Sequence, residues 1–138
     1  MTMNRRTLNT ALAAAALGGL LPASVLAQKK LVLGFAQVGA ESEWRTANTE
    51  SIKSSAKEAG IELKFSDAQQ KQENQIKAIR SYIAQKVDVI AFSPVVESGW
   101  ETVLREAKAA KIPVVLTDRS VNTKDDSLYV TFMGSDFT

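Results

Sequence analysis

The sequence predicts an α/β fold built on a mostly parallel, doubly wound sheet. Short apolar runs recur about every 25 to 30 residues, and segments with helical patterning lie between them. The run at 87–92 is almost continuously apolar, as expected for a strand that helices cover on both faces. Together these observations favour alternating strands and helices in one domain.

Four apolar runs predict strands, and a fifth follows a polar stretch near the end of the chain: 31–36, 61–66, 87–92, 112–117 and 128–133. The first helix is expected over 43–59, and Gly60 is expected to end it as a left-handed residue. A second helix, over 70–85, follows from isoleucines spaced three and four residues apart.

The third helix has the strongest pattern. Its apolar positions recur at helical spacing and form one stripe that should face the sheet: Trp100, Val103, Leu104, Ala107 and Ala110. Ser98, with Glu101 three residues later, predicts a capping box at the start of this helix. Pro113 follows its end.

Residues 1–27 are expected to direct export rather than to join the fold. Arg5 and Arg6 precede a short apolar stretch, and small residues end at Ala27, which predicts a signal peptide cleaved before Gln28. The apolar stretch is shorter than the ~20 residues that span a bilayer. The paired arginines partly match a twin-arginine signal, so the general secretory and twin-arginine routes both stay open. The folded domain is therefore expected over 28–138.

Composition argues against nucleic-acid binding and against the common catalytic sites. Apart from Arg5 and Arg6, the chain carries 15 basic and 15 acidic residues, which leaves no positive surplus for phosphates. It contains no His and no Cys, so it lacks the commonest general base, the thiol nucleophile and the usual zinc ligands. No phosphate-binding glycine loop follows the first strand. We expect a neutral small molecule as ligand, and no catalytic residue, metal or cofactor.

Polar side chains close the predicted strands at the edge where open parallel sheets bind ligands. They are Gln37, Asp67, Ser93, Asp118 and Arg119. The Asp–Arg pair suits a hydroxyl-rich ligand, because the carboxylate accepts and the guanidinium donates several hydrogen bonds. A structural salt bridge is the alternative for this pair. Asp67 is favoured as a helix cap, and Ser93 can simply end its strand.

The loop after the first strand carries an acid, an aromatic ring and an arginine within five residues. Trp44 can stack on a sugar ring while Glu41 and Arg45 bond its hydroxyls. Alternatively, Trp44 can belong to the core, because Ala47 follows it at helical spacing. The residues by themselves leave these two interpretations level.

Several segments resemble the galactofuranose-binding proteins of bacterial ABC importers, and the likeness covers nearly the whole chain after residue 27. The segments are 33–39, Glu41 with Trp44 and Arg45, 69–76, 93–96, 99–101, and 112–114 leading to Asp118 and Arg119. The resemblance implies the flavodoxin-like N-terminal lobe of a type I periplasmic binding protein, whose two α/β lobes close on a sugar.

The resemblance also implies which residues bind the sugar, and it favours ligand contact for Trp44: Glu41, Ser42, Glu43, Trp44, Arg45, Asp118 and Arg119. The strand-end argument adds Gln37, Ser93 and Asp67 as weaker candidates. Two residues depart from the family, which has glycine in their place. Glu43 leaves the identity of the sugar open, and Lys86, at the end of the second helix, is expected to strain the backbone.

The likeness ends at residues 134–136, where relatives cross into a second lobe. It therefore implies a periplasmic, unlipidated receptor lobe, with the second lobe missing, that delivers a monosaccharide to an ABC permease and is monomeric when full length. A sugar receptor for chemotaxis or for a sensor kinase is the alternative. A sugar-responsive transcription regulator shares this core, but the signal peptide and the lack of an N-terminal helix-turn-helix disfavour it. A small flavodoxin-like enzyme is disfavoured by the missing phosphate loop and histidine.

Overall fold

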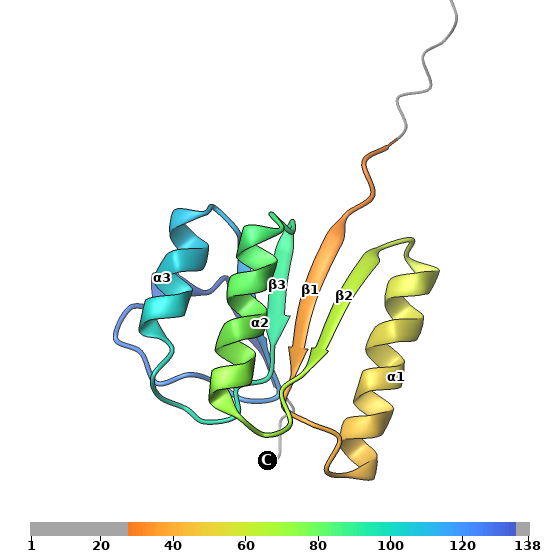
Figure 1. Ribbon diagram of the computed structural model, residues 1–138, viewed down its shortest axis with the longest axis horizontal. Helices are drawn as coiled ribbons and strands as arrows, with labels where there is room; N and C mark the ends of the chain where they lie inside the picture. Colours follow the sequence, from red (N-terminus) through yellow and green to blue (C-terminus); the bar gives the residue numbers. More distant parts are fainter. Residues whose placement is uncertain (1–27, 135–138) are drawn as a thin grey trace, which may run out of the picture.

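The computed structural model describes residues 28–134, which form a five-stranded parallel sheet and three α-helices (Figure 1). In chain order the elements are β1 (Val32–Gln37), α1 (Glu43–Glu58), β2 (Glu62–Asp67), α2 (Gln72–Ala84), β3 (Val89–Phe92), α3 (Glu101–Ala109), β4 (Val114–Thr117), a 3₁₀ helix (Asp126–Leu128) and β5 (Thr131–Met133). The strand order is β2-β1-β3-β4-β5. The predicted α/β class and parallel sheet are confirmed. The expected signal peptide lies outside the described residues.

Helices cover both faces of the sheet, as a doubly wound fold requires. Gly34 in β1 lies against the Tyr82 ring of α2, since a Cβ on this glycine would come within 2.5 Å of the ring. Gln37, three residues further along β1, donates a hydrogen bond to Thr49 of α1. Side chains three positions apart on a strand point to opposite faces. Therefore α1 covers one face and α2 the other, where α3 packs beside it.

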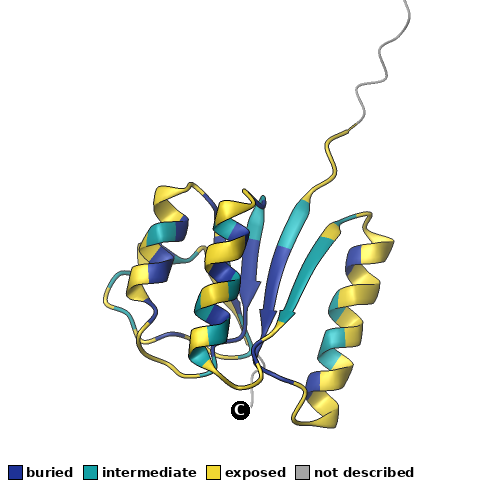
Figure 2. Ribbon diagram, viewed as in Figure 1, coloured by how far each residue is buried: buried dark blue, intermediate teal, exposed yellow. Residues whose placement is uncertain are grey.

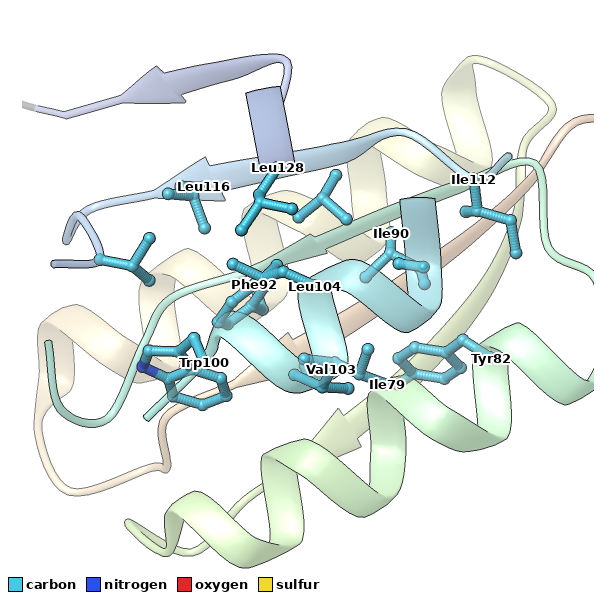
Figure 3. Close-up of a cluster of buried hydrophobic side chains, with 14 of the residues drawn as sticks. Ile79, Tyr82, Ile90, Phe92, Trp100, Val103, Leu104, Ile112, Leu116 and Leu128 are labelled. Atoms are coloured by element: carbon cyan, nitrogen blue, oxygen red, sulfur yellow. The ribbon is translucent and has the colours of Figure 1, made fainter. Parts of the chain in front are cut away.

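The core lies between the sheet and the layer formed by α2 and α3 (Figure 3). The rings of Phe92 in β3 and Trp100 have centroids 4.9 Å apart. The predicted stripe of α3 is buried except for Ala110, which is exposed because it is the C-cap residue of the helix. Each large apolar side chain buried here contributes about 1.5–3 kcal/mol of transfer free energy. This layer therefore supplies most of the apolar stabilisation.

α1 is much less buried than the other helices. Only Arg45 and Ala56 are buried along its 16 residues, and Figure 2 shows its ribbon as mostly exposed. Its first turns are therefore positioned largely by polar contacts, among them the bond from Gln37 to Thr49. None of the helices within residues 28–134 combines the length and the hydrophobicity needed to cross a membrane.

All three helices end in the same backbone motif. The residue after each C-cap is left-handed: Gly60 (φ 67°), Lys86 (φ 54°) and Lys111 (φ 59°). In α2 the N–H of the following residue, Val87, donates to the carbonyl of Tyr82 at 3.2 Å, as in a Schellman motif. The expected role of Gly60 is confirmed, and so is the unfavourable conformation expected at Lys86.

This motif also shifts the strand starts. β2, β3 and β4 each begin one or two residues after the start of the apolar run that predicts them, because Ile61, Val87 and Ile112 still bond to the preceding helix. The fifth apolar run contributes Leu128 to the 3₁₀ helix, and only its last residues form β5. α2 begins at Gln72, two residues later than predicted, because Gln69 and Gln70 both adopt positive φ.

The predicted capping box at α3 is wrong. The helix begins at Glu101 with Trp100 as N-cap, and no side chain caps it. Ser98 instead lies in the preceding loop, where its carbonyl accepts a hydrogen bond from the Gln72 side chain at 2.7 Å. Gly99, with φ 86°, separates Ser98 from the helix and places it too far away for a cap.

Candidate ligand-binding site

The carboxyl ends of all five strands lie along one edge of the sheet, because every pairing is parallel. The register places Gln37 beside Asp67, and Thr117 beside Met133. The loop from β1 to α1 and the loop after β4 leave the sheet at this edge (Figure 1). The strand-end residues predicted from the sequence therefore share one rim.

Ser42 starts α1 and orients the aromatic–arginine pair that follows. It is the N-cap residue, in an extended conformation, and its Oγ accepts the N–H of Arg45 at 3.2 Å. Trp44, in the first turn, is 51 % exposed. This exposure excludes the core interpretation of Trp44. The Arg45 guanidinium carbon lies 4.8 Å from the centroid of the Trp44 ring, within cation–π range.

Arg45 is buried and joins two loops through its charge. Its Nε lies 3.2 Å from Glu41 Oε1, and its Nη2 lies 2.8 Å from Asp118 Oδ2. The second contact has ion-pair distance without hydrogen-bond geometry. Asp118 Oδ2, and Nη1 on the same guanidinium, are both buried and lack a hydrogen-bond partner among residues 28–134. An unmet donor and an unmet acceptor thus stand next to each other, an arrangement more typical of functional sites than of cores.

A cavity of about 280 Å³ adjoins this pair. We call it the α1–β4 cavity, and it is lined by Trp44, Asn48, Ile52, Thr117, Asp118, Met133 and Gly134. Its volume is close to the lower limit for small-molecule sites. A larger hollow of about 580 Å³ lies along Glu43, Thr46 and Glu50. We place the site in the smaller one because Asp118 lines it, whereas the larger lacks Asp118 and has carboxylates along its length; Arg45 lines neither cavity and lies behind Asp118.

Asp118 and Arg119 follow β4 directly. Asp118 is left-handed, with φ 65°, and its N–H donates to the carbonyl of Met133 at 2.8 Å. The Arg119 side chain is half exposed; its Nη1 donates to the carbonyl of Val95 at 3.3 Å, and its Nε lies 3.8 Å from Asp118 Oδ2. The guanidinium therefore stays beside the carboxylate at the rim while remaining open to solvent.

Two of the three weaker candidates, Gln37 and Ser93, support the rim through hydrogen bonds. Gln37 is buried, and its amide bonds the backbone N–H of Val38 as well as Thr49. Ser93 is buried with its Oγ 2.9 Å from Thr117 Oγ1. Neither side chain lines the α1–β4 cavity.

Asp67 does not cap a helix, which corrects the role favoured from the sequence. Its Oδ1 accepts the N–H of Gln69 at 2.7 Å, two residues on, and Lys71 occupies the N-cap of α2. The carboxylate therefore closes an Asx turn before the helix begins. Glu43 lies outside the α1–β4 cavity, in the larger hollow.

The sequence argument missed two cavity residues on α1. Asn48 and Ile52 follow Trp44 at intervals of four, so all three lie on one face of the helix. That spacing was visible in the sequence and could have identified them. Within the described part of the chain, no group of His, Cys, Asp or Glu side chains is arranged to hold a metal ion.

A family model described as a periplasmic binding protein domain matches residues 33–138. The chain belongs to this family. The galactofuranose-binding protein YtfQ of Escherichia coli (strain K12) is 59% identical over 106 residues, covering 77% of this chain and 33% of that protein. The chain thus spans about a third of the length of that relative.

Two solved structures resemble this chain closely. A Mycobacterium smegmatis protein in complex with β-D-fucofuranose has a TM-score of 0.76 and 69% identity, with 78% of this chain and 35% of that chain covered. The arabinose ABC transporter component of Shewanella sp. ANA-3, bound to α- and β-L-arabinofuranose, has a TM-score of 0.76 and 62% identity, with 77% and 35% covered. The fold of this lobe is therefore that of the family.

Proposed function

We propose that this periplasmic binding protein captures a furanose sugar at the α1–β4 cavity. The observation that carries the proposal is the adjacent pair Arg45 Nη1 and Asp118 Oδ2, both buried and without hydrogen-bond partners within residues 28–134. Asp118 lines the cavity and its side chain is partly exposed, so a sugar hydroxyl can donate to the carboxylate while the buried Arg45 holds that carboxylate in place. Leaving such a group unmet costs about 1–3 kcal/mol, so the site gains by binding a hydroxyl.

The neighbouring residues fit a sugar ring. Trp44 offers an exposed flat face for the C–H side of the ring, and Arg119 offers donors at the rim. Glu41 and Ser42 contribute indirectly, because Glu41 pairs with Arg45 and Ser42 caps α1. Five-membered rings are favoured because one similar protein is named for galactofuranose and two similar structures contain bound fucofuranose or arabinofuranose.

A ligand-observed NMR experiment tests the ring form directly. In solutions of D-galactose or L-arabinose, furanose and pyranose forms coexist and give separate resonances, so each sample contains its own control. Saturation of the protein should transfer to the furanose signals and much less to the pyranose signals. Trp44→Ala should abolish the transfer, whereas Leu31→Ala, which removes an exposed apolar side chain just before β1, at the opposite end of that strand from the site, should not. Equal transfer to both ring forms would contradict furanose selection.

We further propose that the bound sugar passes unchanged to an ABC permease. The Shewanella relative is named as a component of an ABC transporter. The chain lacks the histidine and cysteine that most often act as base and nucleophile, which favours binding without conversion. Detection of a chemically altered sugar after incubation with the purified chain would contradict this proposal.

Residues 1–27 carry the proposed route to the periplasm. Their arginines, apolar stretch and terminal small residues support export followed by cleavage after Ala27. The mature chain should then start at Gln28, and mass spectrometry of periplasmic protein reads that start directly. A membrane-bound product that retains Met1 would contradict the proposal.

A further inference from the structure

Residues 69–76, the glutamine-rich segment that leads into α2, do not line the α1–β4 cavity. Two of its glutamines point instead to the segment between β3 and α3. We call this segment, residues 93–100, the β3–α3 loop. Gln72 donates to the carbonyl of Ser98 at 2.7 Å, and Gln75 reaches deeper, to the start of the loop.

Gln75 is fully buried, and both polar atoms of its side chain are bonded to backbone. Its Nε2 donates to the carbonyl of Ser93 at 2.6 Å and to that of Ala36 at 3.2 Å. Its Oε1 accepts the N–H of Val95 at 2.9 Å. One side chain therefore ties the end of β1 to the end of β3 and to the first turn of the β3–α3 loop.

The β3–α3 loop in turn reaches the candidate site. The carbonyl of Val95, whose N–H is held by Gln75, accepts Arg119 Nη1 at 3.3 Å. Ser93, whose carbonyl is held by Gln75, has its hydroxyl 2.9 Å from that of Thr117, the residue before Asp118. Both connections run from one buried amide to the two residues proposed to bind the sugar.

We infer that Gln75 is a positioning residue, which sets the β3–α3 loop so that Val95 orients the Arg119 guanidinium at the rim. The expected consequence for sugar binding rests on the proposed function, whereas the geometry of the Gln75 contacts does not. Because the bonds are buried, no water replaces them when the amide is removed, and the loop loses two backbone anchors together with its link to Ala36 of β1. The role gives a reason for a buried glutamine at position 75, on the side of α2 that faces the sheet.

The test replaces Gln75 with methionine in the full chain, which keeps the length of the side chain and removes its hydrogen bonds. The Val95 amide should exchange with solvent at least ~10-fold faster, since it loses its acceptor. The Arg119 Nε–H heteronuclear NOE should fall, which reports a less ordered guanidinium. Saturation transfer to the furanose form should fall with it.

Tyr82→Phe is the matched control, since it also removes buried hydrogen bonds from α2, to the Phe35 carbonyl and to Ser66. It should lower stability without changing the Arg119 signal. An unchanged Arg119 signal in Gln75→Met, or an equal change in Tyr82→Phe, would overturn the inference. A loosened Arg119 with unchanged furanose binding would uphold the positioning role and contradict the proposed role of Arg119 in binding.

A measurement on the unaltered chain covers the case in which Gln75→Met does not fold. The Gln75 side-chain amide protons and the Val95 N–H should exchange far more slowly than the side-chain amide of Gln85, which is exposed on the same helix. Equally fast exchange at Gln75 and Gln85 would overturn the inference, because the buried bonds would then not persist in solution.

Discussion

At the residue scale, Asp118 combines two roles that the sequence presents as alternatives. Its carboxylate pairs with the buried Arg45 at 2.8 Å, which is the structural salt bridge. The same Oδ2 has no hydrogen-bond partner within the described residues, which is the feature proposed to bind a sugar. The two roles are compatible because an ion pair needs proximity, whereas a hydrogen bond also needs direction.

Asp118→Asn should remove the charge of the side chain while keeping its shape. Asparagine tolerates the left-handed conformation found here, φ 65°, so the backbone can stay as it is. Arg45 keeps Glu41 but loses its second carboxylate, so we expect a loss of about 1–2 kcal/mol in unfolding free energy together with weaker furanose binding. Urea unfolding and saturation transfer measure the two effects. Arg119→Gln, which alters an exposed pair, should cost less than ~1 kcal/mol of stability.

The outcome for Asp118→Asn discriminates between the two roles. A loss of stability with unaltered furanose transfer would leave Asp118 a structural residue only. The converse, unaltered stability with lost transfer, would show that Arg45 does not depend on this pair for its burial.

The sequence located the rim but could not tell which rim residues are free to bind. The end of a strand is visible as the end of an apolar run, and so Asp118 and Arg119 were found. Whether a side chain points outward or bonds inward depends on partners distant in sequence. The Ser93 hydroxyl forms a hydrogen bond with that of Thr117, 24 residues away, and no local pattern predicts that contact.

At the element scale, the helix ends show where local signals are present and where they are absent. Gly60 identifies the end of α1 because glycine adopts positive φ without strain. Lys111 occupies the equivalent place after α3, but a lysine carries no such signal, and its left-handed conformation was missed. Strand starts were placed early for the same reason, since the Schellman motif bonds the first apolar residue back to the helix.

Lys86→Gly should stabilise the fold. A lysine in the left-handed region is strained by its Cβ, and glycine removes that strain at the cost of some chain entropy, so we expect a gain of about 0.5–1 kcal/mol. Lys77→Gly, the same substitution at an exposed interior position of α2, should instead cost about 1 kcal/mol. Chemical denaturation of the two variants gives the comparison. A loss of stability in both would show that Lys86 is not strained.

At the scale of the whole molecule, the class of fold followed from repetition, whereas the arrangement of the strands did not. Alternating apolar runs and helical patterns predict a parallel sheet covered on both faces, and the structure confirms it. Nothing in a single run states that β1 lies between β2 and β3. That order decides which segments meet at the rim, where Arg45 in the first turn of α1 lies next to Asp118 after β4.

Affinity also depends on the whole molecule. We expect the 138-residue chain to bind furanose with a dissociation constant of ~1 mM or weaker. The residues proposed to bind the sugar line one open side: Trp44 is 51 % exposed and Arg119 is half exposed. Water therefore competes for each hydrogen bond to the sugar. Two-lobed periplasmic receptors remove this competition by closing around the ligand.

A chimera measures the contribution of enclosure. Residues 33–134 of this chain should replace the corresponding segment of the E. coli galactofuranose-binding protein, to which the chain is 59% identical over 106 residues. Because the chimera contains the other two-thirds of that relative, its affinity should exceed that of the chain by at least ~100-fold, equivalent to about 2.7 kcal/mol. Calorimetry on the chimera and NMR titration of the chain supply the two constants. Micromolar binding by the monomeric chain would show instead that the rim around Arg45 and Asp118 suffices without enclosure.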